Sequence, residues 1–309
     1  MATLQNVIKT RGLLWSTSAA RFFGLGLQVA PSRSFFSKPT EPAYPGHYPL
    51  NTLQNAFMAV GSAVAALRDP RRGDMIAALG ETTAGSSLNY LRDAMLASAE
   101  GRRVLRERPN VNSATVDMDA LRTLPEGSFG RAYVTWLEKC GVTPDTREPV
   151  HYIDDPELAY VMKRYRESHD FYHCICNLPV NVESELALKF FEFANFGIPM
   201  TLISGLFGHL KLDTVKRERL FREYVPWAMR CGGSAHPLIT VYWEERWTQN
   251  VEEMKKEFGI WDPPAAVWPA PLSEAAREKR RKAKAAREKA EAESDSPVAQ
   301  ASGSHGPFS

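Results

Sequence analysis

The sequence predicts an all-α protein, built as a single helical domain with a segment of different composition at each end. Three observations support this fold class. Apolar residues recur at helical spacing in several segments between residues 51 and 257. The one alternating, strand-like run is weak and covers only Val150–Ile153. The two ends differ from the rest in composition, since the N-terminal end is basic and free of acidic residues and the C-terminal end has almost nothing apolar to bury.

The first predicted helix covers residues 51–67. Asn51 is a suitable N-cap, and Asp69-Pro70 ends the helix because a residue before proline avoids the helical conformation. One stripe of this helix carries Leu53, Phe57, Met58, Val60 and Val64.

The later helices are marked by similar signals. A helix over 86–98 begins at Ser86-Ser87, and one over 130–139 follows a turn at 126–128. Asp155 with Pro156 in the first turn predicts a helix that continues to about Cys176. The remaining predicted helices run from 181–184 to 195, and over 199–208, 213–230 and 237–257.

The N-terminal segment, residues 1–40, is predicted to be a mitochondrial transit peptide. It contains five Lys or Arg residues, many Ser and Thr, and no acidic residue before Glu41. The stretch Arg33–Ser37 is typical of presequence removal, so we expect the mature chain to begin near residue 36. The alternative is a disordered basic tail.

The C-terminal segment, residues 271–309, is predicted to be a disordered charged tail. Residues 273–294 are almost entirely Ala, Arg, Lys, Glu and Ser, which leaves almost nothing apolar to bury. A basic stripe there that touches anionic lipid or RNA is the alternative. The folded domain is therefore expected over residues 41–270.

Composition limits the classes of function. The net charge is only +2, and no nucleic-acid-binding motif is present, so we expect no nucleic-acid partner. Four scattered cysteines indicate a reducing compartment rather than a disulfide framework. The apolar stretch 193–208 has 16 residues with Gly and Pro interruptions and is too short to span a bilayer.

The segment with the strongest chemical signal is His169-Asp170-x-x-His173, followed by Glu185. His169 and His173 are four residues apart, which places both imidazoles on one helical face. Asp170 lies within the same arc, and a turn at Pro179 can return Glu185 to the histidines. Two imidazoles and two carboxylates suit Zn²⁺, with Fe²⁺ or Mn²⁺ as alternatives by ligand type.

Other interpretations of this segment carry weight. Two histidines at i,i+4 are commonly a surface pair or a hydrogen-bonded pair without metal. Cys174 and Cys176 are potential soft ligands, but Cys174 points about 100° away from His173, so we interpret both cysteines as core residues.

With these residues in place, the chain resembles the coenzyme Q (ubiquinone) biosynthesis protein 4 family, in its mitochondrial, fungal form. The family pattern His-Asp-x-x-His, with Glu twelve residues after the second His, is met by His169, Asp170, His173 and Glu185. Two positions depart from it, since Asn177 and Ser184 stand where the family usually has Gly. Asn tolerates left-handed backbone, so the turn is expected to survive. Matching segments also occur at Tyr44–His47, Gly80–Thr83, Leu124–Gly127, Arg147, 154–155, Arg164–Glu167, Gly197–Pro199 and Tyr242–Trp247.

The resemblance implies a peripheral protein on the matrix side of the mitochondrial inner membrane, within a complex of other coenzyme Q biosynthesis enzymes. It implies Zn²⁺ at the motif and C1-decarboxylation of a 4-hydroxy-3-methoxy-5-polyprenylbenzoate, in some accounts with hydroxylation at the same carbon. Zn²⁺ alone cannot supply the electron transfer that hydroxylation would need.

A mechanism can be written for such a lyase. The metal acts as a Lewis acid, and Asp170 or a metal-bound water delivers a proton to C1. Arg166 is a candidate partner for the substrate carboxylate, whereas Arg164 is expected in a surface salt bridge with Glu167 or Asp155.

Residues 190–210 are the candidate contact for a polyprenylated benzoate or quinone lipid, or for the membrane surface. A buried core is an equal alternative for the first half. The main alternative to an enzyme is a non-catalytic lipid-binding scaffold that organises the coenzyme Q biosynthetic complex. A zinc hydrolase is set aside because the His-Glu-x-x-His arrangement is missing.

Overall fold

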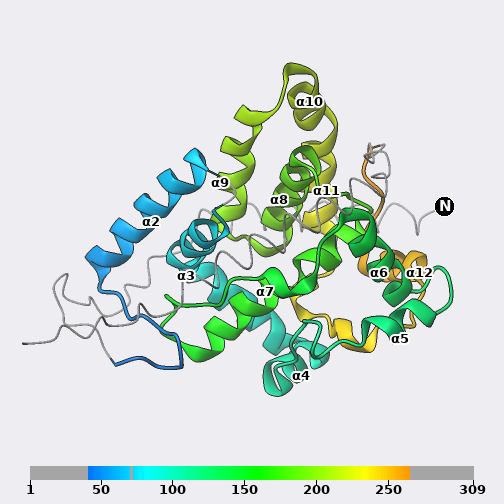
Figure 1. Ribbon diagram of the computed structural model, residues 1–309, viewed down its shortest axis with the longest axis horizontal. Coiled ribbons are helices and arrows are strands. Elements are labelled where there is room, and N and C mark those ends of the chain that lie inside the picture. Colours follow the sequence, from blue (N-terminus) through cyan, green and yellow to red (C-terminus); the bar gives the residue numbers. More distant parts are fainter. Residues whose placement is uncertain (1–40, 70–71, 265–309) are drawn as a thin grey trace, which may run out of the picture.

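The structure is a computed structural model that describes residues 41–69 and 72–264 (Figure 1). Helices form the whole framework of this part of the chain, in which the only β-pairing is an isolated bridge between Ser128 and Asn250. The all-α prediction is confirmed. The predicted transit peptide and charged tail lie outside the described residues.

The α-helices follow one another along the chain with only short connections. They are α2 (Thr52–Arg68), α3 (Gly73–Ala97), α4 (Ala99–Glu107), α5 (Met118–Thr123), α6 (Phe129–Cys140), α7 (Pro156–Ile175), α8 (Val182–Phe196), α9 (Pro199–Gly208), α10 (Thr214–Arg219), α11 (Val225–Ser234) and α12 (Val251–Phe258). Short 3₁₀ turns are η1 (Pro144–Thr146), η2 (His209–Lys211), η4 (Leu238–Thr240) and η5 (Trp243–Glu245), and η3 (Leu220–Tyr224) is a π turn.

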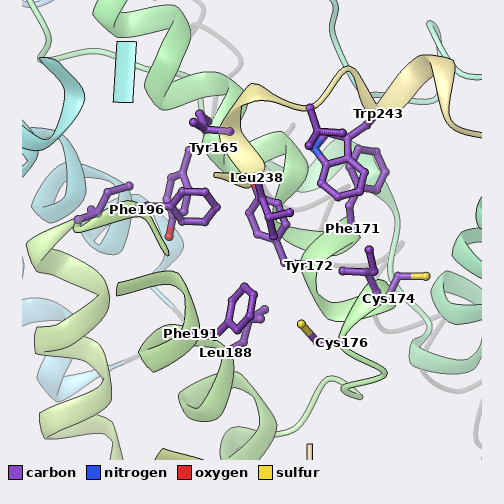
Figure 2. Packing of buried hydrophobic residues seen from close by; sticks show 14 of the residues in the cluster. Tyr165, Phe171, Tyr172, Cys174, Cys176, Leu188, Phe191, Phe196, Leu238 and Trp243 are labelled. Carbon is purple, nitrogen blue, oxygen red and sulfur yellow. The ribbon is translucent and has the colours of Figure 1, made fainter. Parts of the chain in front are cut away.

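Helix α7 crosses the centre of the molecule (Figure 1) and is buried along most of its length. It begins as predicted, because the Asp155 carboxylate accepts hydrogen bonds from the amides of Glu157 and Leu158. Its aromatic residues enter the main core, where Phe171 and Tyr172 lie near Trp243 (Figure 2). The helix that carries the metal motif is therefore held in place on several sides.

Helix α8 packs against both α9 and α11. The contact with α11 is close at Gly232, where a Cβ atom would lie 2.4 Å from the backbone oxygen of Phe191. Only glycine at this position permits the close contact between α8 and α11. Helix α9 occupies the predicted range, and the predicted helix over 213–230 corresponds to α10, η3 and α11.

Helix α2 agrees with the prediction in its bounds but not in its environment. Asn51 forms a capping box with Gln54, and the helix packs on α3. The predicted apolar stripe does not face the core, since Phe57 is 71% exposed and Val60 is 66% exposed. Helical periodicity identified the helix correctly but cannot say what covers its apolar face.

Two helices and part of a third were not predicted from the sequence. Helix α4 begins at Ser98, whose side chain caps the helix, and α5 begins at Asp117, whose carboxylate accepts from two amides. The predicted helix over 86–98 is only the second half of α3, which bends at Gly85. The cap residues were visible in the sequence, but the short apolar stripes that follow them gave a weak signal.

The predicted helix over 237–257 is wrong, because only Val251–Phe258 forms an α-helix. The preceding segment forms only the 3₁₀ turns η4 and η5, and three of its carbonyls make tertiary hydrogen bonds. The carbonyls of Trp247 and Gln249 accept from the amides of Gly130 and Phe129, and Val241 accepts from Arg164.

The weak strand expected at Val150–Ile153 is absent. The amides of His151 and Tyr152 both donate to the buried Glu81 carboxylate, at 2.7 and 2.6 Å. A side chain thus satisfies this extended backbone in place of a neighbouring strand.

Candidate metal centre

The last turns of α7 present His169 and His173 on one face. Their ring centroids are 4.8 Å apart and the ring planes are nearly perpendicular, at 89°. Both side chains are buried, and His173 also stacks on Trp136. The i,i+4 prediction for the two histidines is confirmed by this geometry.

The chain returns from α7 to α8 through a short turn. Asn177 adopts a left-handed backbone with φ 52°, so the turn survives the replacement of the family's usual glycine. Asn181 then caps α8 by accepting from the Ser184 amide, and the Glu185 amide donates to the Asn181 carbonyl. Glu185 is thereby placed in the first turn of α8, opposite the histidines.

The Glu185 carboxylate bridges the two imidazoles. One oxygen lies 3.3 Å from His169 Nε2, and the other lies 2.9 Å from His173 Nε2. One ligand atom from each of the three residues falls within 4.8 Å of the other two. His173 and Glu185 are twelve residues apart, and His169 lies four residues before His173. Together they form a three-residue group that can hold a metal ion.

The donor set fits a divalent metal. Atoms bound to tetrahedral zinc at about 2.1 Å lie about 3.4 Å apart, close to the spacings seen here. Two imidazole nitrogens and a carboxylate also form the three-ligand arrangement that leaves a further coordination position for substrate. The set is compatible with Zn²⁺ and with other divalent transition metals, so it fixes the site and not the metal.

The charges around the triad favour the deprotonated carboxylate. Burial raises the pKa of Glu185, but His169 and Lys189 outweigh that effect and hold this pKa well below its usual range. Burial and Lys189 lower the pKa of His169, whereas Glu192 and Glu185 raise it, and the net effect is a raised pKa.

Asp170 is not brought into this group. Its buried carboxylate forms an ion pair with the Arg147 guanidinium, which is itself 30% exposed. Asp170 remains one residue from His169 and three from His173 along α7, so the pair borders the triad. The prediction that Asp170 is a fourth ligand would require the carboxylate to exchange Arg147 for the metal.

Two buried polar atoms lie beside this ion pair without a hydrogen-bond partner among the described residues. They are Arg147 Nε and the Tyr133 hydroxyl. Burial raises the pKa of Tyr133, and the Asp170 carboxylate adds to the increase. Unsatisfied donors in a buried position are costly, and a polar ligand that accepts from them would offset that cost.

The arginines on α7 do not have the predicted environments. Arg166 donates to Glu81 Oε1 at 2.7 Å and to the carbonyls of Ala77, Glu148 and Pro149, so its donors are used within the fold. Arg164 is completely buried rather than at the surface. Its partner is Glu244, at 2.5 and 2.8 Å, and not Glu167 or Asp155.

A second layer of residues behind His169 was not predicted from the sequence. Glu192 accepts from His169 Nδ1 at 2.6 Å, and Lys189 lies 2.8 Å from the same carboxyl group. Both residues follow Glu185 on one face of α8, at i+4 and i+7, and this spacing was available in the sequence. Cys174 and Cys176 are buried in the core (Figure 2), which confirms their interpretation as packing residues.

The sequence profile of the family described as "Coenzyme Q (ubiquinone) biosynthesis protein Coq4" matches residues 44–264. This range contains nearly all of the described fold and every residue of the triad. The chain belongs to the Coq4 family. The resemblance drawn from the His169–Glu185 motif is thus confirmed.

Curated members of the Coq4 family are similar over most of their length. "Ubiquinone biosynthesis protein COQ4, mitochondrial" of Laccaria bicolor is 71% identical over 255 residues, which cover 82% of this chain and 85% of that protein. The protein of the same name from Coprinopsis cinerea is 65% identical, over 79% of this chain and 84% of its own length.

The fold is also similar to a crystal structure of a Nostoc punctiforme protein. The TM-score is 0.54 at 21% sequence identity, and the match covers 66% of this chain and 98% of that one. At this identity the similarity concerns the fold alone. In the described part of the chain, none of the helices combines the length and apolar character that a membrane span requires.

Proposed function

We propose that the chain acts in mitochondrial ubiquinone biosynthesis as a metal-dependent lyase. The reaction is C1-decarboxylation of a 4-hydroxy-3-methoxy-5-polyprenylbenzoate, and the protein works with other coenzyme Q biosynthesis enzymes. The observation that carries the proposal is the His169–His173–Glu185 triad beside the Arg147–Asp170 ion pair. Family membership and the names of the relatives supply the pathway.

The triad would hold Zn²⁺ through two imidazole nitrogens and the Glu185 carboxylate. A divalent cation there supplies Lewis-acid stabilisation for negative charge on a substrate oxygen. Asp170 either joins this set as the fourth ligand or acts next to it, and the two roles predict different zinc affinities when its carboxylate is removed.

Arg147 is the candidate partner for the substrate carboxylate, in place of Arg166. Its side chain is partly exposed and its Nε has no partner among the described residues. A planar guanidinium binds a carboxylate through two parallel hydrogen bonds. A substrate carboxylate that takes Arg147 would release the Asp170 carboxyl group from its ion pair.

Asp170 is the proposed source of the proton that the reaction needs. The bond between C1 and the carboxyl carbon breaks, CO₂ leaves, and the electron pair of the bond stays on C1. Asp170 then gives its proton to C1 and regains one from water. No oxidant is required for this balance.

The outer edge of the molecule supports the predicted contact with the inner-membrane surface. Helix α2 carries no charged residue from Thr52 to Leu67, and its exposed apolar residues have counterparts at the end of α9. Both helices pack on α3 (Figure 1). Arg68 and Lys211 directly follow the exposed Leu67 and Leu210 in the chain and suit anionic lipid headgroups. The exposed set is Leu53, Phe57, Val60, Val64, Leu67, Leu206, Phe207 and Leu210.

The same edge favours a second candidate function, a non-catalytic lipid-binding scaffold for the biosynthetic complex. The two candidates differ in the behaviour of purified protein. A lyase releases CO₂ from a short-chain, carboxyl-labelled 4-hydroxy-3-methoxy-5-prenylbenzoate once zinc is supplied, whereas a scaffold does not.

The decisive variant is Asp170→Asn in the full chain. We expect it to fold and to slow CO₂ release by roughly 10²–10⁴-fold, the usual contribution of a positioned acid. Unchanged zinc affinity would assign the acid role, and a large loss of affinity would assign the ligand role. Asp93→Asn, on the surface of α3, serves as the matched control and should retain turnover. A folded, zinc-loaded parent that never releases CO₂ would leave the scaffold as the better account.

A further inference from the structure

The two histidines of the triad differ in what lies behind them. The outer nitrogen of His169, Nδ1, is 2.6 Å from Glu192 Oε1. The outer nitrogen of His173, Nδ1, is buried and has no hydrogen-bond partner in the described part of the chain. The fold therefore specifies the orientation of one imidazole by hydrogen bonding and the other by packing against Trp136.

Glu192 is itself strongly held. Its side chain has no exposed surface, and it accepts from the Tyr165 hydroxyl at 2.8 Å and from Lys189 Nζ at 2.8 Å, besides facing His169. Burial raises the pKa of Glu192, but Lys189 and His169 more than offset this and lower the pKa to about 2. Three donors, from His169, Tyr165 and Lys189, therefore converge on one buried carboxyl group.

A carboxylate oxygen 2.6 Å from Nδ1 selects one form of a neutral imidazole. The proton lies on Nδ1, and the lone pair lies on Nε2. In this structure Nε2 is the atom that faces Glu185, at 3.3 Å. A carboxylate behind a metal-binding histidine also increases the basicity of that histidine and fixes its ring orientation.

We propose that Glu192 is a positioning residue that holds His169 as the Nδ1–H tautomer with Nε2 presented to the metal, while Lys189 and Tyr165 hold the Glu192 carboxylate in place. This inference rests on the proposed metal site. Lys189 also lies 3.5 Å from Glu185 Oε1, so one buried cation stands between the carboxylate that binds and the carboxylate that orients. The proposed metal-binding unit extends over about two turns of α8, from Glu185 to Glu192.

A purely structural role for Glu192 is the competing explanation, since it could simply neutralise Lys189 in the core. Two variants of the full chain separate the roles. Lys189→Met removes the ion pair but keeps the Glu192–His169 contact. The double variant Lys189→Met/Glu192→Leu removes that contact as well and leaves no unpaired lysine behind.

The first readout needs no metal. Long-range ¹H–¹⁵N spectra, recorded above the titration of His169, report which ring nitrogen carries the proton, and the His169→Gln spectrum identifies the signal. We expect the Nδ1–H form in the parent and in Lys189→Met, and a mixture of tautomers in the double variant. An Nε2–H form in the parent, or an unchanged tautomer in the double variant, would overturn the inference.

The second readout is zinc affinity by competition with a chelator, with helical circular dichroism as a check on folding. Loss of an orienting partner typically weakens metal affinity about 10–100-fold, and we expect this loss in the double variant relative to Lys189→Met. Equal affinities would contradict a positioning role. If neither the parent nor the variants bind zinc, the metal site fails, but the tautomer measurement still decides what Glu192 does to His169.

Discussion

The centre and the outer edge of this molecule reverse the usual distribution of polar and apolar groups. Around α7 and α8, charged side chains such as Arg164, Glu192 and Asp170 are buried and paired. Along α2 and the end of α9, large apolar side chains such as Phe57 and Leu210 lie in solvent. Buried charges and exposed apolar patches both cost free energy in a soluble domain unless they are used.

The comparison indicates two uses that divide the fold. The buried charges build the proposed metal-binding unit and the ion pair next to it, and the main core surrounds α7. The exposed apolar residues project from a helix that is packed mainly on α3 and are available to a bilayer. Helix α3 contacts α2, α7 and α9, and so connects the two regions.

The largest expected effect comes from breaking a buried ion pair at the centre. Arg164 is completely buried and relies on Glu244 for two of its hydrogen bonds. In Glu244→Ala this guanidinium loses its counter-charge, and we expect a loss of about 3–5 kcal/mol in the free energy of unfolding, measured by urea denaturation. A pair at the surface provides the matched control. Glu218→Ala breaks the exposed Arg222–Glu218 pair on the α10–η3 segment and should cost less than about 0.5 kcal/mol. Similar losses in both variants would contradict the difference drawn between centre and edge.

A smaller effect is expected at the edge, and it should concern binding rather than folding. Phe57 is 71% exposed on α2, so Phe57→Ser removes little buried surface and should leave the urea midpoint nearly unchanged. If the side chain enters the bilayer, its loss weakens binding by roughly 1.5–3 kcal/mol, or about 10–100-fold. Flotation with vesicles of phosphatidylcholine and an anionic lipid measures this change.

The matched control for Phe57 is Tyr90, an exposed aromatic residue on α3. Tyr90→Ser should bind the vesicles within about twofold of the parent, since one residue away from the contact contributes little of the buried apolar area. Vesicle binding that Phe57→Ser leaves intact would remove α2 from the proposed membrane contact.

Local signals in the sequence predicted much of the fold and part of the site. Asp155-Pro156 located the start of α7, and the spacing of His169, His173 and Glu185 predicted the triad that the structure assembles. These features depend on residues close together in the chain, where helix geometry alone decides which side chains meet.

Features that depend on tertiary contacts could not be predicted from local sequence signals. The carbonyl of Val241 is bound by Arg164, and those of Trp247 and Gln249 are bound by the start of α6, in place of the helix that the periodicity favours. Arg147 meets Asp170 across 23 residues, and no spacing rule points to that pair. The exposed stripe on α2 has the same hydrophobic pattern as a buried one. Such a pattern does not reveal which part of the protein, if any, covers it.

The metal content of the purified full chain tests the central claim most directly. Elemental analysis of the parent, with zinc supplied, should give close to one equivalent of zinc per chain. His169→Ala should lose the zinc while its helical circular dichroism persists, because α7 is held by Phe171 and Tyr172 as well as by the site. A well-folded parent that holds no metal even after reconstitution would contradict the triad assignment and favour the lipid-binding scaffold.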